Sequence, residues 1–163
     1  MNESSLLHEL IARSAQRTPS APALSYGAES LSYQELQTSV QAFSAGMMQL
    51  GLQRGERVAI YLEKRFETVI ASFGAPAAGG VFVPLNPLLK AEQVAFILRD
   101  CNVRVLLTSP ERLALLDLRG ISPELFGLSP LLIQQHHDDA FDVERVTKDF
   151  YREIANWYFW ARE

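Results

Sequence analysis

The stretch GGVFVPLNP, residues 79–87, combines two glycines, a short apolar run and two prolines. The run Val81–Val83 is rich in strand-forming residues, and its composition predicts a buried β-strand. Pro84 and Pro87 each lack a backbone N–H, so the strand must end where they stand. The glycine pair lets the chain pass closely from a preceding helix into this strand.

Strands and helices alternate on both sides of this stretch. Val58–Leu62 and Val103–Leu107 are short apolar runs that predict strands. The predicted helices are a stripe over residues 66–73 that Pro76 should kink or end, a segment over Lys90–Asp100, and a start at Ser109–Pro110–Glu111. Strands joined by helices over residues 57–116 predict an α/β layered domain, with a mainly parallel sheet flanked by helices.

Three elements are predicted before the first of these strands. They are a helix over residues 5–16 with Leu6, Leu7, Leu10 and Ile11 inward and Ser4 or Ser5 as its cap, a hairpin of 23–26 and 29–31, and a helix from Ser32 to about residue 50. Ser32 stands three residues before Glu35, which is the spacing of a capping box. Gly51 is placed to end that helix.

The composition restricts the class of protein. The chain has 163 residues, 48% apolar and 21% charged, with a formal net charge of −4. This is typical of a globular domain, and nucleic-acid binding is not favoured. The single cysteine, Cys101, excludes an intramolecular disulfide and a cysteine-based zinc site, and we expect it to be half-buried at a helix end. The N-terminus lacks a basic signal region and no apolar run is long enough to span a membrane, so the expected compartment is the cytoplasm.

The character of the sequence changes after residue 116. Residues 117–140 carry glycines and prolines at short intervals and are interpreted as a linker. Residues 141–163 hold seven of the sixteen aromatic residues. Their apolar positions fall on one helical face, which predicts a C-terminal amphipathic helix. The three predicted parts are therefore 1–116, 117–140 and 141–163.

Two motifs resemble the start of the adenylate-forming enzymes, the AMP-forming acyl-CoA ligases and their adenylation-domain relatives. They are LSYQEL at residues 31–36 and AAGGVFVPLNP at 77–87, and the resemblance covers about residues 5–116. It is closer to acyl-CoA ligases than to peptide-synthetase modules. It implies the N-terminal portion of the ligase fold and a parent reaction that activates a carboxylic acid to an acyl-adenylate and then an acyl-CoA.

The resemblance transfers fold residues but no catalytic residues. Gly79, Gly80, Pro84, Asn86 and Pro87 match the motif and are expected to act structurally. The family uses ATP, Mg²⁺ and coenzyme A, and grips phosphates with a Ser/Thr/Gly-rich loop and a lysine that have no counterpart here. The interpretation is therefore a truncated ligase, inactive alone, with no catalytic, cofactor-binding or metal-ligating residue.

Two alternatives stay open. The chain could be a non-catalytic interaction module that self-associates or binds a protein partner through a sheet edge and the aromatic helix. The segment FDVERVTKDFYREI, residues 141–154, also resembles more weakly a helical segment of restriction-modification DNA methyltransferases. That second resemblance implies a fused or frame-disrupted product, although the catalytic motifs of methyltransferases are missing.

The remaining candidate side chains are better explained without a functional role. His136, His137, Asp138 and Asp139 are adjacent rather than spaced as metal ligands on one helix face, so a polar loop is favoured. His8 is expected to be a surface or half-buried residue of the first helix. Lys64 and Arg65 at a helix start are expected to lie on a solvated face.

Overall fold

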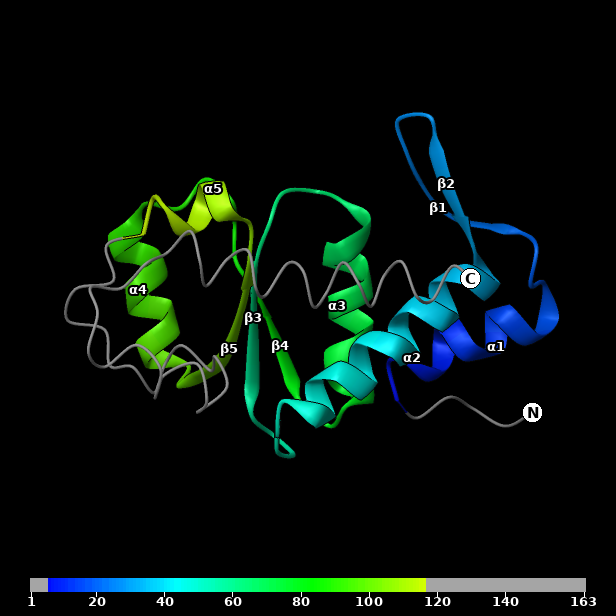
Figure 1. The fold of residues 1–163 in the computed structure, drawn as a ribbon, viewed down its shortest axis with the longest axis horizontal. Coiled ribbons are helices and arrows are strands. Elements are labelled where there is room, and N and C mark those ends of the chain that lie inside the picture. The colour runs from blue at the N-terminus through cyan, green and yellow to red at the C-terminus, as the bar shows by residue number, and fades with distance from the viewer. Residues whose placement is uncertain (1–5, 117–163) are drawn as a thin grey trace.

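A three-stranded parallel sheet lies at the centre of the part of the chain that the computed structural model describes, residues 6–116 (Figure 1). Its strands are β3 (Arg57–Tyr61), β4 (Val81–Pro84) and β5 (Val103–Thr108), in the order β4–β3–β5. Val58 pairs with Phe82 on one side and with Val105 on the other. The first of these strands in the chain therefore occupies the middle of the sheet.

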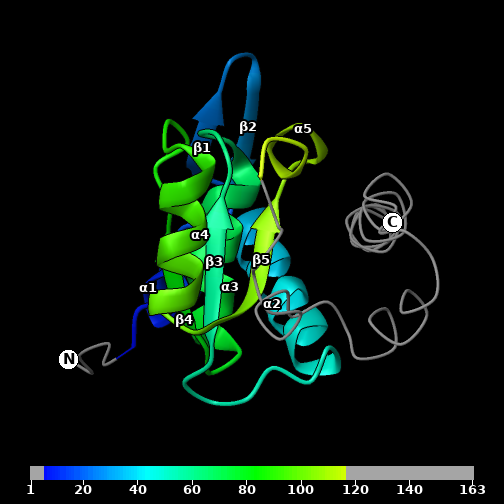
Figure 2. The ribbon, with the colours of Figure 1, turned by 90° about the vertical axis from the view of Figure 1, so that its left-hand side faces the viewer.

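The helices that connect the strands cover opposite faces of the sheet. Helix α3 (Phe66–Ala77) joins β3 to β4, and helix α4 (Ala91–Asp100) leads back past β3 to β5. Because crossovers between parallel strands are right-handed, reversing the direction of travel puts the two helices on different faces. Figures 1 and 2 show α4 on one side of the sheet and α3 with α2 on the other. The predicted α/β layered fold with a parallel sheet is confirmed for these residues.

Each face of the sheet has its own apolar core. Val58 and Ile60 of β3 point to the side where α2 and α3 pack, among buried residues such as Val40. The alternate residues Ala59 and Tyr61 point to the side covered by α4. Side chains of a strand alternate between its faces, so β3 contributes to both cores and is almost fully buried.

A helix, a hairpin and a long helix precede the sheet. These are α1 (Glu9–Arg17), the antiparallel pair β1 (Pro22–Tyr26) and β2 (Glu29–Ser32), and α2 (Tyr33–Gln49). The capping box at the start of α2 is confirmed: the Glu35 backbone N–H donates to Ser32 Oγ at 3.3 Å, and the Ser32 N–H donates to Glu35 Oε2 at 2.8 Å. Gly51 follows α2 with φ +80°, as its predicted stop requires.

The predicted inward face of the first helix is wrong in part. Leu6, Leu7 and Leu10 are 54%, 41% and 50% exposed, whereas Ile11 and Ala15 are buried. Helix α1 begins only at Glu9, since the chain before it forms a turn. Leu6 and Leu7 therefore lie before the helix, and Leu10 lies on its outer face. The buried face of α1 is formed by Ile11 and Ala15, which are four residues apart.

The prediction that β4 is a buried strand is also wrong for the described residues. β4 pairs with β3 on one side only, and Val81 is 48% exposed. Val81 N donates to the Glu56 carbonyl at 2.8 Å and Leu85 N to the Ile60 carbonyl at 2.9 Å, so alternate positions face β3. Residue 84 then falls on the outer side, where a proline offers no donor. An apolar composition indicates a strand, but its burial depends on its place in the sheet.

The glycine pair before β4 has the role that its sequence predicts. Gly79 has φ +85°, a conformation that other residues rarely adopt. A Cβ on Gly80 would lie 3.2 Å from the backbone oxygens of both Ala75 and Glu56. Helix α3 contains Pro76 in its last turn and ends at Ala77, as predicted.

The structure also bears on what the sequence predicts for the cysteine, for membrane spans and for the chain after residue 116. Cys101 is half-buried at the C-terminal cap of α4, as expected. Within residues 6–116, no helix combines the length and the apolar character needed to cross a membrane. The predicted linker at 117–140 and the aromatic helix at 141–163 lie outside the described residues.

Candidate functional site at the carboxyl end of the sheet

The carboxyl ends of the three strands meet at one edge of the sheet. Strand β3 continues into α3 on one face, while β5 continues into the short helix α5 (Pro110–Leu113). Leu116, which follows α5, packs against the core on the α4 face. Adjacent strands therefore lead to opposite faces at this point, and in open α/β sheets ligands bind where this happens.

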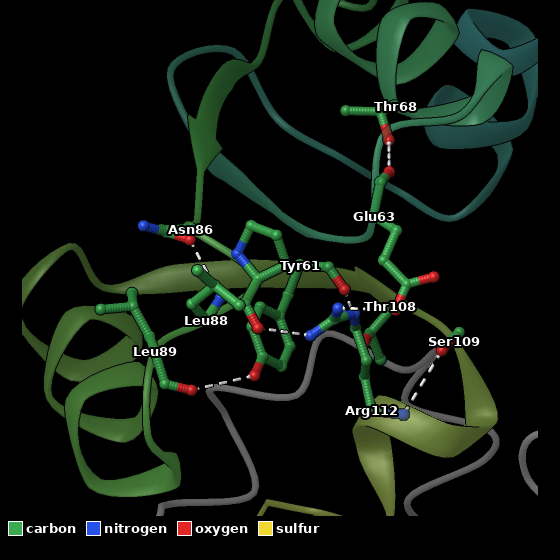
Figure 3. A network of polar contacts seen from close by, with 10 residues as sticks. Tyr61, Glu63, Thr68, Asn86, Leu88, Leu89, Thr108, Ser109 and Arg112 are labelled. Carbon is green, nitrogen blue, oxygen red and sulfur yellow. Dashed lines mark hydrogen bonds and ion pairs between the residues drawn. The ribbon is translucent and has the colours of Figure 1, made fainter. Parts of the chain in front are cut away.

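Arg112 is the centre of a polar network at this edge (Figure 3). Its Nη1 donates to the Pro87 carbonyl at 2.7 Å, and its Nη2 donates to Glu63 Oε1 at 2.7 Å. The guanidinium carbon lies 4.9 Å from the centre of the Tyr61 ring, within the range of a cation–π contact. One side chain of α5, the helix that follows β5, thus contacts the loops that follow β3 and β4.

Tyr61 and Thr108 fix the strand ends beneath the arginine. The Thr108 hydroxyl donates to the Tyr61 carbonyl at 2.9 Å in a buried position. The Tyr61 hydroxyl donates to the Leu89 carbonyl at 3.2 Å. Because Tyr61 is 2% exposed, its ring is a fixed platform for the guanidinium.

The loop after β4 is held by its own asparagine as well. The Leu88 backbone N–H donates to Asn86 Oδ1 at 2.9 Å, which is a local turn of the kind asparagine favours. With the Pro87 carbonyl bound to Arg112 of α5 and the Leu89 carbonyl bound to Tyr61 of β3, two carbonyls of this loop are fixed from two different elements. The end of the GGVFVPLNP stretch is therefore a fixed part of this edge.

The charges at the site are one cation and one anion. The Arg112 side chain is 11% exposed and the Glu63 side chain is 73% exposed. The Nε atom of Arg112 is buried and has no hydrogen-bond partner among the described residues. Such a site can bind and orient an anionic group. Among residues 6–116, no three side chains of His, Cys, Asp or Glu gather as metal ligands would.

The residues singled out in the sequence are divided between the site and other places. Asn86 and Pro87 belong to the site, while Gly79 and Gly80 lie before the opposite end of β4. His8 is half-buried at the start of α1, as expected. Lys64 and Arg65 are exposed, as expected, and Arg65 Nε pairs with Glu67 at 2.9 Å. The segment His136, His137, Asp138 and Asp139 lies outside the described residues.

Sequence reasoning did not find Tyr61, Glu63 or Arg112. Arg112 is 25 residues from Pro87 and 49 residues from Glu63, so no local spacing connects them. The predicted helix start at Ser109 was the one signal nearby, and it is confirmed by the 3.3 Å bond from Arg112 N to Ser109 Oγ.

Comparison with known proteins identifies the class. The family model described as AMP-binding enzyme matches residues 11–151, most of the chain. The chain belongs to this family and corresponds to the N-terminal portion of its AMP-binding domain. The recognition of adenylate-forming enzymes from the two motifs is confirmed, and the match continues beyond residue 116, where the resemblance noted in the sequence ends.

The relatives include both peptide synthetases and an acyl-CoA ligase. The chain is 32% identical over 131 residues to malpinin synthetase of Mortierella alpina, covering 77% of this chain and 2% of that protein. It is 34% identical over 102 residues to a long-chain-fatty-acid–CoA ligase of Bacillus subtilis, covering 63% of this chain and 18% of the ligase. The chain therefore spans a small part of the relatives it matches.

Solved structures show the same fold. VinN matches with a TM-score of 0.67 and 31% identity, covering 91% of this chain and 36% of VinN. The anthranilate CoA ligase AuaEII, solved with anthranoyl-AMP, matches with a TM-score of 0.71 and 25% identity, covering 78% of this chain and 25% of the ligase.

Proposed function

We propose that this chain supplies the N-terminal scaffold of an AMP-forming acyl-CoA ligase and does not form an acyl-adenylate by itself. The parent reaction is the ATP-dependent activation of a carboxylic acid to an acyl-adenylate, followed by transfer to coenzyme A. The observation that carries the proposal is the family match over residues 11–151. The ligase of Bacillus subtilis supports the acyl-CoA branch, whereas the peptide synthetases among the relatives support an adenylation domain.

The expected inactivity of this chain rests on what nucleotide activation requires. The reaction needs several preorganised donors around the phosphates as charge develops. Among residues 6–116, the cation described at the carboxyl edge of the sheet is the single guanidinium of Arg112, which by itself does not surround a triphosphate. The glycine pair, Gly79 and Gly80, leads into a strand rather than into a helix N-terminus that could cradle phosphate.

ATP–pyrophosphate exchange tests this proposal directly. The purified chain is incubated with ATP, Mg²⁺, labelled pyrophosphate and a panel of carboxylic and amino acids. We expect no exchange above the background without enzyme, while the full-length Bacillus subtilis ligase, assayed in parallel, exchanges with its fatty-acid substrate. Acid-dependent exchange by the purified chain would overturn the proposal.

A second candidate function is an assembly module that acts through its sheet. Strand β5 pairs with β3 on one side, and no strand of residues 6–116 pairs with its other side. A strand edge of this kind is a template for pairing with another chain. The role proposed for the aromatic segment at 141–163 stays a prediction from sequence.

A further inference from the structure

In the guanidinium of Arg112, Nη2 donates to Glu63, whereas the neighbouring Nε donates to none of the described residues. Its five donors are held in a rigid plane, and Nε–H and one N–H of Nη2 point from the same edge. This edge matches the two oxygens of a carboxylate or a phosphate. In the structure Nη2 donates to Glu63 Oε1 at 2.7 Å, while the buried Nε has no partner among the described residues. Glu63 thus uses one of these two nitrogens, and the other donates to none of the described residues.

The other contacts of the guanidinium leave this edge free to exchange its partner. Nη1 is held separately by the Pro87 carbonyl at 2.7 Å, and the plane rests near the ring of Tyr61. The arginine would therefore stay in place if Glu63 moved away. A preorganised guanidinium of low exposure interacts with an anion more strongly than one in water.

Glu63 can move away without disturbing the backbone. Its side chain is 73% exposed, and only Oε1 contacts Arg112. The backbone carbonyl of Glu63 is fixed independently by the Thr68 hydroxyl at 2.7 Å. Glu63 accepts from Nη2 only, so an external anion that accepts from both Nε and Nη2 exchanges one charge-assisted bond for two.

We propose that the Nε–Nη2 edge of Arg112 is a binding site for an oxyanion, either a carboxylate or a phosphate group, and that Glu63 occupies it in the absence of a ligand. The incoming anion accepts from both Nε and Nη2. It thereby gives a partner to Nε, which has none when Glu63 is bound. Its place at the carboxyl ends of β3 and β5 is where open α/β sheets bind ligands. This inference is independent of the proposed function, since binding at Arg112 requires neither ATP nor catalysis.

The experiment is an NMR titration of the full chain that observes the Nε–H resonances of arginine. Inorganic phosphate is added to one sample and acetate to another, with chloride keeping the ionic strength constant. The Arg112 signal, assigned by its loss in R112K, is expected to shift with saturation. E63Q should bind the same anion about threefold more tightly, because its neutral amide competes less well than a carboxylate. A response to either anion supports the site, and the better probe identifies the preferred oxyanion.

E67Q is the matched control. It removes an equal charge four residues away, where Glu67 pairs with the exposed Arg65. If E67Q tightens binding as much as E63Q, the effect is one of net charge and the proposal is wrong. An unchanged Arg112 Nε–H signal in both the native chain and E63Q would also overturn it. These outcomes do not depend on R112K being folded, because only the assignment uses that variant, and selective labelling can replace it.

Discussion

At the scale of single residues, two helix glycines have opposite surroundings. A Cβ built on Gly74 of α3 would lie 2.5 Å from Cδ1 and 3.2 Å from Cβ of Phe43 on α2. A Cβ built on Gly46 of α2 would meet nothing within 4 Å. The close packing of α2 on α3 therefore requires a residue without a side chain at position 74, whereas a side chain at position 46 would not disturb it.

Replacement of these glycines by alanine should therefore have effects of opposite sign. We expect G74A to lower the free energy of unfolding by about 1 to 3 kcal/mol, because Phe43 must shift in a packed core. G46A should raise it by about 0.5 to 1 kcal/mol, through helix propensity alone. Urea unfolding followed by circular dichroism measures both. Equal changes of the same sign in the two variants would show that packing at Gly74 is not tight.

Residue chemistry also explains why the site was not predicted while the turns were. Gly79, Pro76 and the Ser32–Glu35 pair act on backbone within a few residues of themselves, so their spacing alone indicates their role. Arg112 acts on loops far away in the chain, and its partners are a backbone carbonyl and an exposed carboxylate. Neither partner has a distinctive pattern in a single sequence.

At the scale of elements, the capping box connects the hairpin to α2. Ser32 is both the last residue of β2 and the cap of α2, so one side chain ends a strand and begins a helix. Its hydroxyl accepts from Glu35 N and donates to Glu35 Oε2 at 2.8 Å. Element types were predicted well because signals of this kind lie at their ends, whereas the exposure of α1 and β4 depends on what packs against them.

Loss of this cap should weaken α2 measurably. We expect S32A to lower the free energy of unfolding by about 1 kcal/mol, since the orphan N–H of Glu35 loses its acceptor. S32T retains a hydroxyl and should stay within about 0.5 kcal/mol of the native chain. Hydrogen exchange of the first-turn amides of α2 is the local measurement. Undiminished protection in S32A would mean that packing, and not the cap, fixes the start of the helix.

At the scale of the whole molecule, the two outer strands of the sheet differ as surfaces for assembly. Pro84 removes a donor from the outer side of β4, which discourages pairing there. Strand β5 is six residues long and contains no proline. If the described domain pairs with a second copy, we expect the two copies to form hydrogen bonds along the outer side of β5.

This difference makes a prediction about oligomers. Light scattering should show a concentration-dependent dimer, and amides of β5 should gain protection from hydrogen exchange as the protein concentration rises, while those of β4 do not. V81K, which places a charge on the exposed first residue of β4, should leave the dimer unchanged. A monomer at every concentration, or a dimer abolished by V81K, would contradict assembly through β5.

The central position of β3 also has a consequence for synthesis on the ribosome. Tyr61 receives its hydrogen bond from Thr108, which is 47 residues later in the chain. The middle strand, β3, is synthesised first; one of its flanks stays uncovered until β4 follows, and the other stays uncovered until β5 emerges from the exit tunnel. Nascent chains arrested before residue 108 therefore carry an incomplete sheet, and chaperones that cover bare apolar strands have their opportunity in that interval.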